Sequence, residues 1–136
     1  MKNGLLILTL FALCSLFPSS SAAGANWTFI EKSKDGNMST FIDKESITQI
    51  SEDIVKSCQK FSYAKPTLFN HQKRRVSAVI ACREWDCDAA KYNNLQLTFY
   101  YLDGTKETET YEYALWHYVR NSSPERGLLE YVCTTD

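Results

Sequence analysis

Few residues in this chain have the types and spacing that enzyme or metal chemistry requires. Its two histidines, His71 and His117, stand apart, without the spacing that a metal site needs. Asp86 and Asp88 flank Cys87 and could form a carboxylate pair, although polar residues at a strand end beside a disulfide are the simpler interpretation. The sequence contains no phosphate-binding loop, dinucleotide fingerprint or nucleophile elbow. We therefore expect a protein that is not an enzyme, with no cofactor and no metal site.

The strongest chemical signal is a run of positive charge. The thirty residues from Ile54 to Arg83 contain seven basic residues and no acidic one: Lys56, Lys60, Lys65, Lys73, Arg74, Arg75 and Arg83. Elsewhere the chain is rich in acid, since all sixteen Asp and Glu lie outside this run. A cationic segment in an otherwise acidic domain attracts anionic partners.

The loop inside this run is the predicted partner-binding site. Lys65, Lys73, Arg74 and Arg75 supply charge, and Leu68 and Phe69 supply apolar anchors. Such a loop suits an acidic patch on a host matrix or serum protein, an anionic polysaccharide such as a glycosaminoglycan, or a phospholipid surface. A solubilising hairpin whose charges discourage edge pairing is the alternative.

The first 25 residues have the form of an export signal. Lys2 precedes an apolar run from Leu5 to Phe17, and Ala23-Gly24-Ala25 suits signal peptidase. A run this short does not span a bilayer, and no second apolar run in the sequence is longer. We expect residues 1–25 to be a signal peptide and residues 26–136 to form one domain in the periplasm, at the cell surface or in the medium. Acylation of Cys14, as in a lipoprotein, is the alternative.

Four cysteines remain after that cleavage, and export makes them candidates for disulfides. Cys82 and Cys87 are five residues apart in a predicted strand, so they point to opposite faces and do not pair. Cys58 lies in the preceding strand, where antiparallel pairing places it opposite Cys82. Cys87 then pairs with Cys133. The alternative is that one pair stays reduced.

The remaining pattern predicts an α+β domain, an antiparallel sheet of about six strands with one C-terminal helix packed on it and two disulfides as braces. The predicted strands are 27–32, 40–43, 54–64, 76–86, 94–101 and 105–113, with a helical turn over 44–47. Asp35-Gly36 and Asp103-Gly104 predict tight turns. Ser123-Pro124 predicts the start of a helix that ends at Cys133.

An aromatic cluster precedes the predicted helix. It comprises Tyr111, Tyr113, Trp116 and Tyr118. Aromatic residues at this density are usually buried, so we expect the cluster to pack in the core and against the helix. A platform for a ligand is the alternative.

Five segments follow one another in order: Trp27–Ile30, Phe41–Asp43 with Ser46-Ile47, Tyr63–Pro66, Glu84–Cys87, and Ser123 through Leu128-Leu129 to Cys133. In this order and spacing the chain resembles the bacterial surface-adhesin protein E family. The resemblance implies a six-stranded antiparallel sheet with a C-terminal helix and a Cys87–Cys133 bridge. It also implies an envelope or secreted protein that binds host extracellular-matrix and serum proteins. The pair Cys58 and Cys82 is an addition to the family pattern.

These observations favour an exported bacterial binding module. A secreted inhibitor that plugs an enzyme with the 65–75 loop, and a housekeeping periplasmic protein without an external ligand, are the alternatives. Nucleic acid is not an expected partner, because the chain works outside the cytosol. The sequence leaves a homodimer open.

Overall fold

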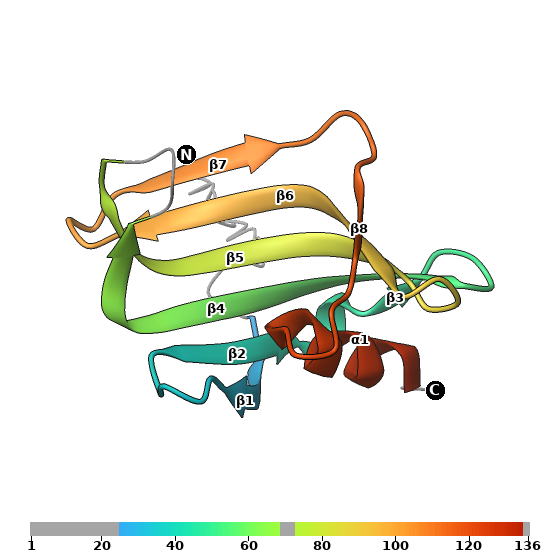
Figure 1. The fold of residues 1–136 in the computed structure, drawn as a ribbon. Coiled ribbons are helices and arrows are strands. Elements are labelled where there is room, and N and C mark those ends of the chain that lie inside the picture. Colours follow the sequence, from blue (N-terminus) through green and yellow to red (C-terminus); the bar gives the residue numbers. More distant parts are fainter. Residues whose placement is uncertain (1–24, 69–72, 135–136) are drawn as a thin grey trace, which may run out of the picture.

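The computed structural model describes residues 25–68 and 73–134, and these form one sheet with one α-helix against it (Figure 1). The strands are β1 (Trp27–Lys32), β2 (Met38–Asp43), β3 (Thr48–Gln49), β4 (Ile54–Leu68), β5 (Arg75–Asp86), β6 (Lys91–Tyr101), β7 (Lys106–Thr110) and β8 (Trp116–Tyr118). The helix is α1 (Pro124–Thr134), and a short 3₁₀ turn covers Lys44–Ser46. The predicted export signal lies outside the described residues.

All strand pairs are antiparallel, in the order β1-β2-β4-β5-β6-β7. The short strands β3 and β8 add to β4 and β6 at their margins. The predicted α+β class, the sheet and the C-terminal helix are therefore confirmed, with β3 and β8 as additions. Gly36 and Gly104 have positive φ in the predicted turns, where a side chain would be strained.

Alternation along β4 and β5 divides the sheet into two faces. Val55, Phe61, Ala81 and Trp85 are buried on one face, because α1 packs there with its buried stripe of Leu128, Leu129 and Val132. The helix contacts β1, β4 and β5, and in Figure 1 the β8 segment crosses in front of the sheet to reach it. We call this the covered face. The opposite face carries no described α-helix.

Both predicted disulfides are present. Cys58 lies directly opposite Cys82 in the β4–β5 register, with Cα atoms 4.0 Å apart. Because the residues beside Cys58, Ser57 and Gln59, are buried on the covered face, this bridge lies on the opposite face. Cys87 binds Cys133 at a Cα distance of 5.7 Å and ties the end of β5 to α1.

Two irregularities in the ladder matter for function. The β4–β5 register shifts between Ser62 and Thr67, where Pro66 has no N–H to donate. The β5–β6 register shifts between Cys82 and Arg83, so no residue of β5 lies opposite Leu95, and Asn94 lies opposite Arg83. The predicted alternation over 94–101 is therefore interrupted at Leu95.

The start of α1 differs from the predicted cap. The Ser123 hydroxyl donates to the Arg120 carbonyl at 2.7 Å, and the Ser123 carbonyl accepts from the Arg126 N–H at 3.1 Å. The turn that precedes the helix brings the Arg120 carbonyl within reach, so the hydroxyl bonds backwards along the chain.

Candidate binding surfaces

Three chain segments meet at one end of the sheet: the β1–β2 turn, the β4 and β5 ends, and the β6–β7 turn (Figure 1, left). Asn37 joins the first two segments, since its carbonyl accepts from the Ala64 N–H at 2.7 Å and its Oδ1 accepts from the Lys65 N–H at 2.8 Å. These bonds give the backbone N–H groups of Ala64 and Lys65 acceptors in the part of β4 where the β4–β5 register is irregular. The turn is therefore fixed beside the predicted binding loop.

This junction gathers exposed cations from two parts of the sequence. We call it the basic end, and it consists of Lys32, Lys34, Lys65, Lys73 and Arg75, all exposed. Lys32 ends β1 and Lys34 lies in the turn that follows, and neither residue was part of the predicted site. Within residues 25–68 and 73–134, no carboxylate forms an ion pair with any of the five. Leu68 is 52% exposed beside them, whereas Phe69 lies outside the described residues.

Arg74, predicted as a partner-binding residue, is already engaged. Its Nη2 donates to Asp103 at 2.7 and 3.0 Å and to Thr105, and its guanidinium lies 3.9 Å from the centre of the Tyr101 ring. Hydrogen bonds from Thr105 and Arg74 lower the pKa of Asp103 to about 2. Arg74 therefore fastens the β5 start to the β6–β7 turn.

Arg83, the last basic residue of the charged run, is not a surface charge. The residue is 7% exposed on the covered face, in phase with Ala81 and Trp85. Its Nε donates to Asn94 at 2.7 Å, and its Nη1 lies 3.5 Å from the Glu125 carboxylate of α1. Desolvation lowers the pKa of Arg83, and the nearby Glu125 opposes that shift. This charge holds the helix to the sheet.

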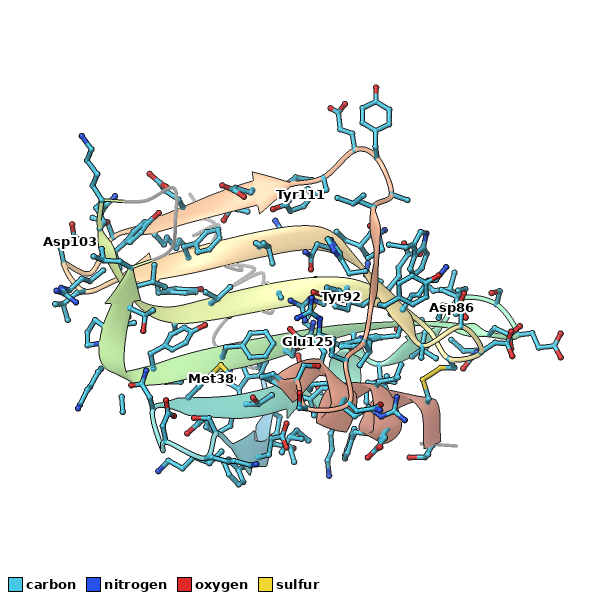
Figure 2. The ribbon with its side chains drawn as sticks, viewed as in Figure 1. Met38, Asp86, Tyr92, Asp103, Tyr111 and Glu125 are labelled. Carbon is cyan, nitrogen blue, oxygen red and sulfur yellow. A yellow bond between two sulfur atoms is a disulfide. The ribbon has the colours of Figure 1, made fainter. Side chains whose placement is uncertain are left out.

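The Arg83 guanidinium is also the base of a stack that reaches the surface. It lies 4.3 Å from the centre of the Tyr92 ring, and that ring stacks on His117 of β8 at 5.1 Å and 27°. Figure 2 shows Tyr92 on β6 and Glu125 on α1 beside the same part of the sheet. Because the outer ring, His117, is exposed, the stack connects the core to a surface platform.

The predicted burial of the aromatic cluster is wrong. Tyr113 is 85% exposed, Tyr118 is 74% exposed, and Tyr111 and Trp116 are about 40% exposed. Only Trp116–Tyr118 of this segment pair with β6, and every residue from 111 to 118 is exposed. The segment crosses to α1 with little covering it, so its aromatic side chains stay in contact with solvent.

A hollow of about 480 Å³ lies between β8 and the start of α1. Its walls contain aromatic, cationic, anionic and hydroxyl groups: Tyr92, Trp116, His117, Tyr118, Arg120, Ser123 and Glu125. No sequence pattern marks these residues as one set. His117 was set aside as an isolated histidine, and only the pairing of β8 with β6 places it on Tyr92.

Neither surface has the groups expected of a metal site. In the described part of the chain, no three His, Cys, Asp or Glu side chains cluster to hold an ion. No helix among the described residues is long and apolar enough to cross a membrane.

Comparisons with known proteins identify the relatives of this chain. The family model described as surface-adhesin protein E matches residues 27–134. A crystal structure of Haemophilus influenzae protein E, crystal form II, aligns with a TM-score of 0.55 at 17% identity, covering 77% of this chain and 86% of that one. Protein E from non-typeable Haemophilus influenzae aligns with a TM-score of 0.52 at 17% identity, covering 87% and 81%. At this identity the two structures support the fold. No curated protein matches the chain significantly.

Proposed function

Because the chain belongs to the surface-adhesin protein E family, we propose that it is a surface binding module whose basic end holds an anionic host ligand. The ligand is a sulfated glycosaminoglycan or an acidic patch of a matrix or serum protein. Lys65, Lys73 and Arg75 make the main contacts, and Lys32 and Lys34 extend the surface.

The main support for this proposal is that five exposed cations lie together at the basic end and form no ion pair within the described residues. Acidic residues gather at the other end of the sheet, where Glu52, Asp53, Asp86 and Asp88 surround the turns before β4 and after β5. At the basic end the exposed cations outnumber Asp35 and the Arg74-paired Asp103, and this excess of positive charge speeds encounter with a negative surface.

The apolar anchors act at a later step. Leu68 and Phe69 adjoin the cations in sequence, and Leu68 is exposed. Apolar contacts form after encounter, so these two residues slow dissociation more than they speed association. Arg74 contributes by holding the turn rather than by offering a free charge.

The test is binding of the purified domain to immobilised heparin across a salt series. Replacing Lys65, Lys73 and Arg75 with Ser should weaken binding about 100-fold at low salt, since each cation near an anionic surface contributes about 1 kcal/mol. The difference should shrink as salt rises, because the screening length falls to ~3 Å at 1 M.

The matched control replaces Lys44, Lys56 and Lys91 with Ser. Lys44 lies in the 3₁₀ turn after β2, and Lys56 and Lys91 lie at the starts of β4 and β6. This variant has the same net charge as the test variant, so equal losses in both would mean that total charge, and not the basic end, governs binding. Parent-like binding by the test variant would leave the hairpin as a solubilising edge.

A further inference from the structure

The hollow beside β8 has the size and the mixture of groups that a small ligand requires. Its volume, about 480 Å³, falls within the range of ~300–1,000 Å³ that ligand sites occupy. Four of its seven wall residues carry aromatic rings, and these are Tyr92, Trp116, His117 and Tyr118. The other three offer charge or a hydroxyl group. Such a mixture suits a ligand with an apolar face and a polar rim.

The walls of this hollow are held in place from below. The stack of Arg83, Tyr92 and His117 fixes the orientation of the His117 ring on β8. The ion pair between Arg83 and Glu125 fixes the side of the hollow formed by α1. Tyr118 is held by the Lys91 ammonium, 4.6 Å from its ring centre. Rigid aromatic groups bind with little loss of conformational entropy, so the site is organised before a ligand arrives.

The charges around the hollow are mainly positive, because Arg120 and Lys91 lie beside it. Glu125 is compensated by buried Arg83. Among the residues that the structure describes, none forms an ion pair with the exposed Arg120 guanidinium. A guanidinium binds a carboxylate through two parallel hydrogen bonds, which gives it a geometric preference for that group.

From these features we propose that the hollow formed by Tyr92, Trp116, His117, Arg120, Ser123 and Glu125 binds a saccharide that carries a carboxylate. The C–H face of a pyranose ring packs on the aromatic walls. Arg120 binds the carboxylate, while Ser123 and Glu125 bind ring hydroxyls. None of these residues belongs to the basic end, so this site is independent of the proposed function.

The experiment compares two soluble probes, 3′-sialyllactose and lactose, which differ in one carboxylate-bearing sugar. Each is titrated into the isotopically labelled domain while amide and indole N–H resonances are recorded. Sialyllactose should shift the Trp116 indole and His117 amide signals, and lactose should bind at least about tenfold more weakly. Equal responses to both probes would overturn the role of the carboxylate, and no response to either would overturn the site.

Two arginine variants locate the charge contact. Arg120→Gln should weaken sialyllactose binding about tenfold or more. Arg120→Lys keeps the charge but loses the planar guanidinium, so its affinity for sialyllactose should lie between those of Arg120→Gln and the parent. Arg75→Gln at the basic end is the matched control and should bind sialyllactose like the parent. An Arg120→Gln variant with a parent-like melting curve and parent-like binding would contradict the assignment.

A third probe separates the saccharide from a peptide. Aromatic-lined grooves also bind proline-rich segments. A proline decamer that shifts the same resonances more strongly than sialyllactose would overturn the proposal in favour of a peptide. The variant with Ser at Lys65, Lys73 and Arg75 should lose heparin binding and keep parent-like sialyllactose binding, which distinguishes failure of the basic end from failure of this site.

Discussion

Arg74 and Arg83 belong to one basic run in the sequence, yet the structure uses them in opposite ways. Arg74 is about 40% exposed and pairs with Asp103 across a turn. Arg83 is buried and pairs with Glu125 across the join between sheet and helix. Both ion pairs connect segments distant in sequence, but only one of them lies in a low-dielectric environment. The comparison teaches that a count of charges describes a surface only when burial is known.

The largest expected effect comes from breaking the buried pair. Arg83→Met should destabilise the domain by about 3–5 kcal/mol, because it leaves the Glu125 carboxylate without its cation and Asn94 without a donor. Arg74→Met should cost no more than about 1 kcal/mol, as exposed pairs do. Urea unfolding followed by tryptophan fluorescence measures both.

Arg83→Met with Glu125→Gln is the control, since it removes both charges together. It should recover part of the loss of the single variant. Similar losses for Arg74→Met and Arg83→Met would show that burial does not separate the two arginines.

The two disulfides extend the comparison to the two faces of the sheet. Replacing Cys87 and Cys133 with Ala should cost about 4 kcal/mol, and replacing Cys58 and Cys82 should cost about 3.5 kcal/mol, because a longer closed loop restrains the unfolded chain more. The sequence separations are 46 and 24. Loss of the Cys87–Cys133 bridge should also loosen the packing of α1 over Arg83.

Amide hydrogen exchange measured on both disulfide variants tests whether the Cys87–Cys133 bridge holds α1 in place. Faster exchange throughout α1 is expected only without the Cys87–Cys133 bridge. Equal protection of α1 in the two variants would mean that Arg83 and the apolar stripe hold the helix without help from the disulfide.

The smallest effect concerns pH at the exposed pair. The folded-state pKa of Asp103 is about 2, below the ordinary 3.8, so its carboxylate favours the folded state above pH 3.8 and that contribution disappears as pH falls through 2. Asp103→Asn should therefore lower the melting temperature slightly at pH 6 and leave it unchanged near pH 1.5. A difference between the two proteins that persists at pH 1.5 would assign the effect to turn geometry rather than to charge.

The sequence predicted features that depend on local pattern. Alternation over 54–64 and 76–86 was enough to place Cys58 opposite Cys82, because both strands are long and regular at that point. The turns at Gly36 and Gly104 followed from the need for positive φ. Strands β3 and β8, of two and three residues, are too short to show any period.

The sites were predicted less completely because they depend on contacts distant in sequence. Lys32 and Lys34 join the basic end only through the pairing of β2 with β4. The hollow beside β8 needs β6, β8 and α1 together. One signal was available and not used: Arg83 shares the period-two phase of Val79, Ala81 and Trp85, which marks it as a residue of the covered face.

The Cys58–Cys82 bridge has a consequence for survival among proteases. Lys73 and Arg75 are exposed trypsin-type cleavage positions, and both lie between the two bridged cysteines. A cut at either of them leaves β4 and β5 covalently joined and still paired from Ile54–Asp86 to Ser62–Ala78. The nicked molecule therefore stays in one piece until it is reduced, and it migrates as two fragments only on a reducing gel.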